Sequence, residues 1–284
     1  MSNTVILYHN DLDGIFSAYQ FLQKYPNAIC QKMDYGVPFD LSLIKDDDYV
    51  IMVDFCIQPY SDFIDLLNRI NRNMLWIDHH KTSVEFEQEF NLSNIPGIRE
   101  VGKAACQLCW EYLNLGVEMP YALKAVSQMD VWDKTGELNW DEEVMPFIYG
   151  LPRRLELGDI LVHDLFDDWA SPTEVEGILI NGLTNLAEIK KANIELMNRY
   201  AFEVDFDGLK FIAINRHGSS IMFESKYDNK IHDGMMCFVR QANNWKFTIY
   251  TDKDIDLSMI AKRHLGGGHS GAAGFELEKL PENF

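Results

Sequence analysis

Three short apolar runs, each followed at once by acidic or histidine side chains, constrain the fold of this chain more than any other feature. The runs are residues 5–8, 50–53 and 74–77. They are continuously apolar, as strands buried on both faces of a parallel sheet are. Reactive groups in such sheets gather beyond the carboxyl ends of the strands, so the polar residues that follow should share one site. Those residues are His9, Asn10, Asp11 and Asp13, then Asp54, then Asp78, His79 and His80.

A site with this composition needs a positive partner. Two carboxylates about 4 Å apart repel each other by roughly 4 kcal/mol at an effective dielectric constant of about 20. The stability of a whole domain is only about 5 to 15 kcal/mol, so several such pairs would endanger the fold. The sequence therefore predicts bound divalent cations, for which carboxylates and imidazoles are suitable ligands.

The spacing of apolar residues predicts an α/β fold in two parts. Helical spacing follows Gly14, which should allow a tight turn into the first helix. We expect an N-terminal parallel-sheet domain over 1–184, a helical linker over 185–202, and a smaller C-terminal α/β domain with a mixed sheet over 203–284. The further helices expected are 60–71, 103–113, 121–130 and 257–265, and the C-terminal strands are 209–214, 235–239 and 245–250.

The net charge of the chain limits its partners. The 284 residues carry 25 basic and 44 acidic side chains, a formal charge of −19, of which −17 falls on the first 202 residues. Long nucleic acid is bound by neutralising many phosphates with Lys and Arg, so a long duplex is excluded as a partner. A small phosphate ester remains compatible, because metal ions can supply the positive charge.

Neither the cysteines nor the hydropathy indicate secretion or a membrane. An odd number of cysteines, five, argues against a disulfide framework, and Cys106 and Cys109 form a CxxC within an apolar helical pattern that favours packing over zinc or redox chemistry. No apolar stretch approaches the roughly 20 residues of a membrane span, and residues 1–10 lack the features of a signal peptide. We expect a cytoplasmic protein without a membrane partner.

The segment from Gly266 to Gly274 is the second informative element. Its sequence is Gly-Gly-Gly-His-Ser-Gly-Ala-Ala-Gly. Glycines let backbone N–H groups converge on an anion, and His269 can donate a hydrogen bond to a phosphate. A glycine-rich turn without function is the alternative.

These motifs together resemble the DHH phosphoesterase superfamily with its DHH-associated C-terminal domain. The resemblance rests on the segment 9–14, Asp54, the triplet 78–80, Asp130 and the terminal glycine–histidine segment. It implies an N-terminal DHH catalytic domain, a C-terminal substrate-binding domain, and two Mn²⁺ ions, for which Mg²⁺ or Co²⁺ could substitute. One ion would be held by His9, Asp11 and Asp54, and the other by Asp13, Asp54, His79 and Asp130. Asp130 enters only through this resemblance.

The resemblance also implies roles around the metals. Asp78 would orient His79, and His80 would face the substrate phosphate, so Asp78 and His80 are the catalytic candidates. Substrate binding would involve His80, Arg240, Gly267, Gly268 and His269. Arg240 is the best match to an arginine that precedes the glycine segment in the family.

The function implied is hydrolysis of short oligonucleotides, as in a nanoRNase-like exonuclease of either polarity. A phosphatase of 3′,5′-bisphosphate nucleotides and a phosphodiesterase of linear or cyclic dinucleotides are the alternatives. A non-catalytic nucleotide-binding regulatory protein is the alternative of another class. The partner expected is thus a short oligonucleotide or small nucleotide, and a homodimer is the assembly we consider.

Overall fold

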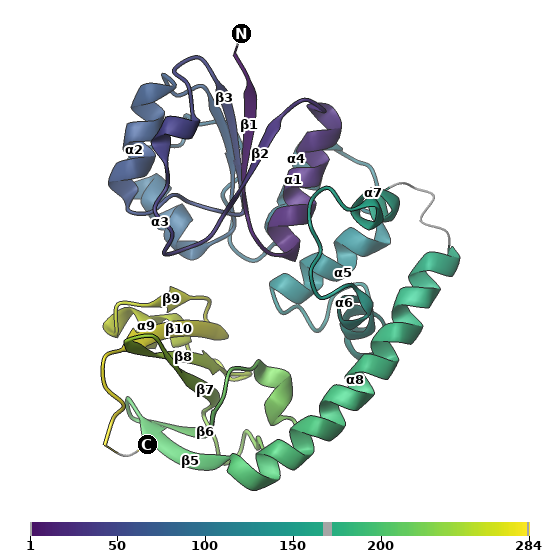
Figure 1. Cartoon of the computed structure of the whole chain (residues 1–284), viewed down its shortest axis with the longest axis vertical. Helices are drawn as coiled ribbons and strands as arrows, with labels where there is room; N and C mark the ends of the chain where they lie inside the picture. Colours follow the sequence, from purple (N-terminus) through teal and green to yellow (C-terminus); the bar gives the residue numbers. More distant parts are fainter. Residues whose placement is uncertain (1, 167–171, 283) are drawn as a thin grey trace. The chain divides into compact units, whose positions relative to one another are not determined.

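The chain divides into two compact units, Met1–Leu183 and Thr184–Phe284. The computed structural model describes residues 2–166, 172–282 and 284 (Figure 1).

The first unit is built on a four-stranded parallel sheet with the strand order β2–β1–β3–β4. The three apolar runs form β1 (Thr4–His9), β3 (Tyr49–Val53) and β4 (Met74–Ile77). The expected parallel sheet is therefore confirmed. The edge strand β2 (Ile29–Met33) was not expected.

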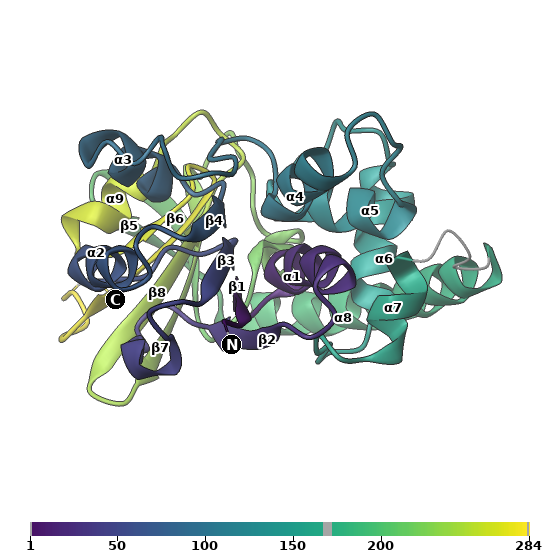
Figure 2. The ribbon, with the colours of Figure 1, turned by 90° about the horizontal axis from the view of Figure 1, so that it is seen from above.

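Helices cover both faces of this sheet. Seen from above, α1 (Leu12–Lys24) and α4 (Ala105–Leu113) lie on one side, and α2 (Tyr60–Arg69) and α3 (Lys81–Glu89) lie on the other (Figure 2). Alternate strand residues enter two separate cores: Ile6 and Tyr8 pack on the α1 side, whereas Val5 and Leu7 pack on the α2 side. This double burial explains why the strands are apolar at every position.

Further helices extend the first unit. They are α5 (Tyr121–Asp130), the π-helical turn η2 (Trp140–Val144), α6 (Met145–Gly150), α7 (Ile160–Phe166) and α8 (Pro172–Tyr200), with a 3₁₀ turn η1 at Leu41–Leu43. The helix α8 crosses the division between the units and contains most of the segment expected as a linker. Gly182 lets α8 pack closely against α6, because a Cβ at this position would be 1.7 Å from the carbonyl oxygen of Pro146.

The second unit contains a six-stranded mixed sheet, as expected for the C-terminal domain. Its strand order is β5–β6–β7–β8–β10–β9, in which only β6 and β7 are parallel. The helix α9 (Leu257–Arg263) packs against one face through Leu257 and Ile260, and Met197 of α8 packs in a second core. The strands are β5 (Phe202–Phe206), β6 (Leu209–Asn215), β7 (Gly234–Gln241), β8 (Asn244–Tyr250), β9 (Gly267–Gly268) and β10 (Ala272–Leu277), with a 3₁₀ turn η3 at Ser220–Phe223.

Within the described residues, no helix has both the length and the apolar character that are required to span a bilayer.

Candidate metal centre

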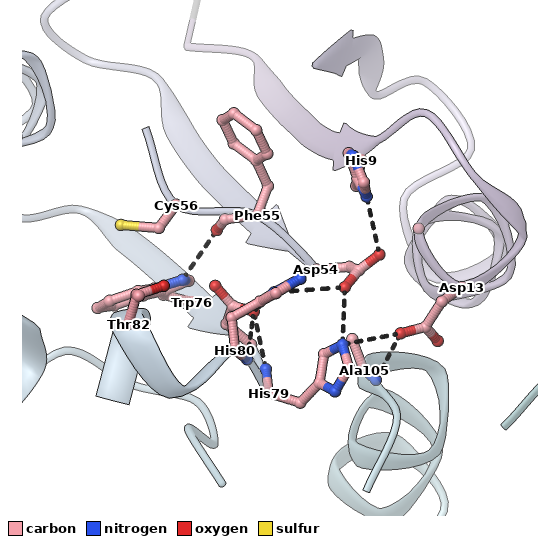
Figure 3. Close-up of polar contacts among 12 residues, drawn as sticks. His9, Asp13, Asp54, Phe55, Cys56, Trp76, His79, His80, Thr82 and Ala105 are labelled. Carbon is pink, nitrogen blue, oxygen red and sulfur yellow. Dashed lines mark hydrogen bonds and ion pairs between the residues drawn. The ribbon is translucent and has the colours of Figure 1, made fainter. Parts of the chain in front are cut away.

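Asp54 lies at the centre of a cluster of acidic and histidine side chains at the carboxyl ends of β1, β3 and β4 (Figure 3). It follows β3 directly and is 2% exposed. Its backbone has a φ of +56°, in the left-handed region that few residues other than glycine occupy and that aspartate tolerates better than most. Its N–H donates to the carbonyl oxygen of Ile77 at 2.9 Å, which fixes the end of β3 to the end of β4.

One side of the cluster joins Asp54 to the end of β1. The Nδ1 atom of His9 lies 2.8 Å from Asp11 Oδ2 and 3.6 Å from Asp54 Oδ2. Asp11 is also the N-cap of α1, since its Oδ1 accepts the N–H of Gly14 at 2.9 Å. The capping bond thus holds the Asp11 carboxylate beside His9.

The other side of the cluster gathers around His79. Its Nε2 atom lies 3.3 Å from Asp54 Oδ1, 3.3 Å from Asp130 Oδ2 and 3.6 Å from Asp13 Oδ2. Asp130 is the last residue of α5, and Asp13 lies in the first turn of α1. Two helices and one strand therefore deliver carboxylates to one imidazole.

Asp13 has a second set of partners that the sequence did not indicate. The N–H groups of Ala105 and Cys106, at the start of α4, donate to its two carboxylate oxygens at 2.8 and 2.7 Å. The N-cap of α4 is Ala104, whose side chain makes no capping bond. A remote aspartate thus caps α4, and the positive end of the helix dipole stabilises a carboxylate of the cluster.

Asp78 orients the two histidines that follow it. One of its oxygens accepts the N–H of His79 at 2.7 Å, the N–H of His80 at 3.2 Å, and a contact with Nδ1 of His80 at 2.7 Å. Burial alone would raise the pKa of Asp78, but the His80 imidazole outweighs it and lowers that pKa to about 2. Asp78 is therefore a buried anion, and its ring contact is with His80.

The remaining charges conflict in the absence of cations. Burial, then the charges of Asp13 and Asp11, raise the pKa of Asp54 well above its usual value. Burial and the charge of Asp13 do the same to the pKa of Asp130. Burial would lower the pKa of His9, but Asp11 and Asp54 overcome it and raise that pKa to about 10.

These residues fit a pair of divalent cations. Ligand atoms of His9, Asp11 and Asp54 lie within 4.8 Å of one another, and so do those of Asp13, Asp54 and His79. Asp54 Oδ1 and Asp130 Oδ2 are buried and accept no hydrogen bond from the described residues. Buried anionic oxygens without donors are costly, and a cation removes that cost.

Gly14 has a different role from the one expected. It lies within α1 and has no positive φ; instead, a Cβ at this position would be 2.1 Å from the carbonyl oxygen of His9. The expectation of a turn residue was wrong. The glycine allows the first turn of α1 to approach the end of β1, which brings Asp11 and Asp13 to the cluster.

The glycine–histidine segment of the second unit is a hairpin in the structure. Gly267 and Gly268 form β9 and pair with Gly274 and Ala273 of β10. The N–H of Gly266 donates to Ala261 and the N–H of His269 donates to Ala272, at 2.8 Å each. Those two N–H groups are thus already used within the hairpin and its neighbours, and not in an anion nest.

Arg240 lies on β7, a central strand of the same sheet, three strand spacings from the edge strand of this hairpin. Across the sheet, Gly267 pairs with Gly274, Gly274 with Thr248, and Thr248 with Cys237 of β7. Arg240 lies three residues beyond Cys237 on β7. Three strand spacings across the sheet and three residues along the strand separate the backbones of Gly267 and Arg240 by about 17 Å. The guanidinium of Arg240 lies over the Trp245 ring, 5.7 Å from its centroid.

Tyr35 and Phe55 lie against the ring of His9, and neither was expected near the cluster. Asn10, which was expected at the shared site, donates to Asp34 in the loop after β2. The polar edge strand before that loop gave no indication that Tyr35 would lie here. Cys106 and Cys109 are buried free thiols, in keeping with a packing role.

The first unit matches a known sequence family. Residues 3–131 correspond to the N-terminal domain of the DHH family. The chain is also 23% identical over 301 residues to uncharacterized protein R106 of Acanthamoeba polyphaga mimivirus. That alignment covers 95% of this chain and 66% of the relative, so the chain spans slightly less than two thirds of the relative's length.

Two solved structures share the fold. A DHH domain from a protein described as a member of a family of ribosomal proteins is 14% identical, with a TM-score of 0.58 over 98% of this chain and 83% of the other. An exopolyphosphatase-related protein from Bacteroides fragilis is 11% identical, with a TM-score of 0.52 over 99% and 88% of the two chains.

Proposed function

Because the chain is a member of the DHH superfamily through its N-terminal domain, we propose that it is a divalent-metal-dependent phosphoesterase. The substrates proposed are short oligonucleotides, and the proposed metal is Mn²⁺. The observation that carries this proposal is the Asp54-centred cluster, in which carboxylates and imidazoles converge at three strand ends.

Asp54 would be shared between two ions. His9 and Asp11 would complete the ligands of one ion, and Asp13, His79 and Asp130 would complete those of the other. The two carboxylate oxygens of Asp54 support this sharing, because Oδ2 lies toward His9 and Oδ1 lies toward His79.

The chain's own residues prepare the site for a phosphoryl group. Two metal ions would supply a hydroxide nucleophile and neutralise charge on the phosphoryl oxygens. Asp78 orients the His80 ring through its contact with Nδ1. With a proton on both ring nitrogens, Nε2 of His80 would donate to a phosphoryl oxygen. The buried N–H donors at the start of α4 hold Asp13 and keep its carboxylate oriented.

Charge favours a short substrate. With a formal charge of −19, the chain would repel a long polyanion over most of its surface. A dinucleotide offers few phosphates, and the metals would neutralise the one that reacts. In the second unit, the proposed substrate contacts are the hairpin at Gly267, Gly268 and His269, and Arg240 on β7.

Two other outcomes stay within reach of the same site. A 3′,5′-bisphosphate nucleotide or a linear or cyclic dinucleotide also places a phosphoryl group on the metals, so a phosphatase or dinucleotide phosphodiesterase is the second candidate. Retention of a full set of ligand types disfavours a protein that only binds nucleotides.

The test is a comparison of substrate lengths. Purified protein with Mn²⁺ is given oligoribonucleotides of two to five residues, a 3′,5′-bisphosphate nucleotide, and long single-stranded DNA, and products are separated by chromatography. We expect the short oligonucleotides to be turned over fastest. Faster turnover of long DNA would contradict the proposed substrate class, and nucleotide binding without turnover of any of them would establish a binding protein instead.

A further inference from the structure

Tyr35 lies beside the metal cluster without being one of its ligands. Its ring centroid is 5.4 Å from that of His9 and 6.0 Å from that of His80, with edge-to-face geometry in both cases. The ring of Phe55 lies 4.6 Å away on another side. Tyr35 thus contacts a candidate ligand of one ion and His80, the histidine that we propose faces the substrate.

The loop that carries Tyr35 is fixed to the first metal motif. The N–H of Asn10 donates to Met33 at 3.1 Å, and the side-chain amide of Asn10 approaches Asp34 Oδ2 at 3.4 Å. Val37 N–H closes the turn onto Asp34 at 3.2 Å, and Gly36 adopts the required positive φ of +83°. The residue between His9 and Asp11 therefore determines where the Tyr35 loop lies.

The surroundings of the Tyr35 hydroxyl indicate that it lies near the cluster, because burial and then the charges of Asp78 and Asp54 raise the pKa of Tyr35. Tyr35 as a whole is 39% exposed, yet its hydroxyl lies within the fields of Asp78 and Asp54. The backbone N–H of Cys56 interacts with the hydroxyl oxygen. A phenol has one hydrogen to donate, and among the described residues nothing accepts it.

A donor at this position has a chemical use. The cluster presents mainly hydrogen-bond acceptors, namely the oxygens of Asp11, Asp13, Asp54 and Asp130. A phosphoryl group also presents only acceptors, so a hydrogen-bond donor is needed beside it. A phenol with an ordinary pKa near 10 is neutral at pH 7, so it can donate to a phosphoryl oxygen without competing for a cation. Such a donor, aimed at an oxygen that gains charge, stabilises the transition state.

We propose that Tyr35 is a catalytic residue whose hydroxyl donates a hydrogen bond to a phosphoryl oxygen of the substrate. This inference rests on the phosphoesterase function proposed above. The proposal assigns the role to the hydroxyl group of Tyr35 and not to its ring. The competing explanation is that the ring stacks on a nucleobase of the substrate.

The test removes the hydroxyl alone. Tyr35→Phe keeps the ring against His9, His80 and Phe55, and Tyr35→Leu removes the ring as well. The matched control is Tyr112→Phe on α4, since Tyr112 has a similar exposed fraction of 44% and lies outside the cluster. Turnover of the diribonucleotide pApA with Mn²⁺ is measured for each variant, together with the thermal stabilisation that Mn²⁺ provides.

We expect Tyr35→Phe to lower kcat about 100-fold, as loss of one transition-state donor does, with KM raised by no more than about fivefold and the stabilisation by Mn²⁺ unchanged. Tyr35→Leu should be as slow, and Tyr112→Phe should match the unaltered chain. Turnover by Tyr35→Phe at the unaltered rate, with a defect confined to Tyr35→Leu, would overturn the hydroxyl role in favour of stacking.

A binding measurement separates this inference from the proposed function. Titration of adenosine 5′-monophosphate in the presence of Mn²⁺ should show affinity about fivefold weaker for Tyr35→Phe, the effect of one neutral hydrogen bond. If the unaltered chain binds this nucleotide but hydrolyses nothing, the phosphoesterase proposal fails while weaker binding by Tyr35→Phe still supports the contact. Equal affinity in both proteins, or no binding by either, would overturn it.

Discussion

Asp54 combines three properties that seldom occur together in one residue: it is buried, it has left-handed backbone geometry, and it lies among other carboxylates. Backbone strain and charge crowding both reduce stability, and they persist where function requires them. The two costs are concentrated on the residue that we propose bridges the metals.

Asp54→Asn should therefore separate stability from metal binding. Without metal, the variant should unfold at a higher temperature than the unaltered chain, because the crowded negative charge is gone. With Mn²⁺, the unaltered chain should gain stability by mass action, whereas the variant should gain little. Thermal unfolding with and without Mn²⁺ measures both effects.

The matched control for this measurement is Asp65→Asn, on the exposed side of α2. It removes the same charge away from the cluster and should change neither value appreciably. Equal stabilisation of Asp54→Asn and the unaltered chain by Mn²⁺ would refute the bridging role.

The raised pKa of Asp54 also predicts a pH dependence. The folded metal-free protein retains a proton on Asp54 at pH values where the unfolded chain, with a pKa near 3.9, has released it. The free energy of unfolding should therefore fall, from this group, as pH rises above 4. Asp78 and His9 add slopes of their own near the two ends of the range from pH 4 to 6.5, because the folded pKa values are about 2 and about 10 whereas the unfolded chain titrates these groups near 3.9 and 6.5.

Urea unfolding in a chelator across pH 4 to 6.5 tests this dependence. The difference between the unaltered chain and Asp54→Asn cancels the other carboxylates. The unaltered chain should lose stability relative to the variant as pH rises; a relative gain would show that Asp54 is not a destabilised anion.

Single residues also show where sequence reasoning ended. The motifs 9–14 and 78–80 predicted a shared site because strand ends meet at one edge of a parallel sheet. The bonds from Ala105 and Cys106 to Asp13 span about 90 positions and involve backbone groups, which leave no mark in side-chain composition. Tyr35 was missed for a similar reason, since its loop reaches the site through Asn10.

Elements were predictable where burial made them regular. The strands β1, β3 and β4 are buried on both faces and read as apolar runs. The strand β2 is an edge strand with exposed Ile29 and polar Gln31 and Lys32, so its pattern resembles a loop. The strand β10 begins in a Gly–Ala segment whose glycines suggested only a turn.

The close approach of α1 to the end of β1 depends on Gly14. Gly14→Ala would place a Cβ 2.1 Å from the His9 carbonyl oxygen, so α1 must shift and carry Asp11 and Asp13 with it. We expect both a lower unfolding temperature and weaker Mn²⁺ affinity. Gly177→Ala is the matched control: it is also helical, has nothing within 4 Å, and should be neutral or stabilising by up to about 1 kcal/mol. Unchanged metal affinity in Gly14→Ala would contradict the positioning role of this contact.

The positions of Arg240 and His269 in the second unit predict different effects of their removal on substrate binding. The register separates Arg240 from the hairpin by three strand spacings, and the Arg240 guanidinium lies over the Trp245 ring. We expect His269→Ala to raise KM for a dinucleotide about 10-fold, as loss of a charge-assisted hydrogen bond would, and Arg240→Ala to raise it much less. Steady-state kinetics would compare them with His217→Ala, which removes an exposed histidine of the same unit. A larger increase in KM for Arg240→Ala than for His269→Ala would place the substrate nearer to β7 than to the hairpin.

At the scale of the whole molecule, the acidic surface and the metal cluster belong to one account. The first 202 residues carry most of the net charge of −19 and also all the proposed ligands. Such a unit attracts cations and repels polyanions, so bound cations would favour the binding of a phosphate there. Residues 203–284 carry a net charge of only −2 and repel an anion less.

The location of bound metal tests the central claim most directly. Crystals of the full chain soaked with Mn²⁺ would be measured at the manganese absorption edge, so that each ion appears as an anomalous difference peak. The account predicts two peaks on either side of the Asp54 carboxylate, one beside His9 and Asp11 and the other beside Asp13, His79 and Asp130. Crystals that diffract well but show no peak at Asp54, or ions bound only elsewhere, would contradict it.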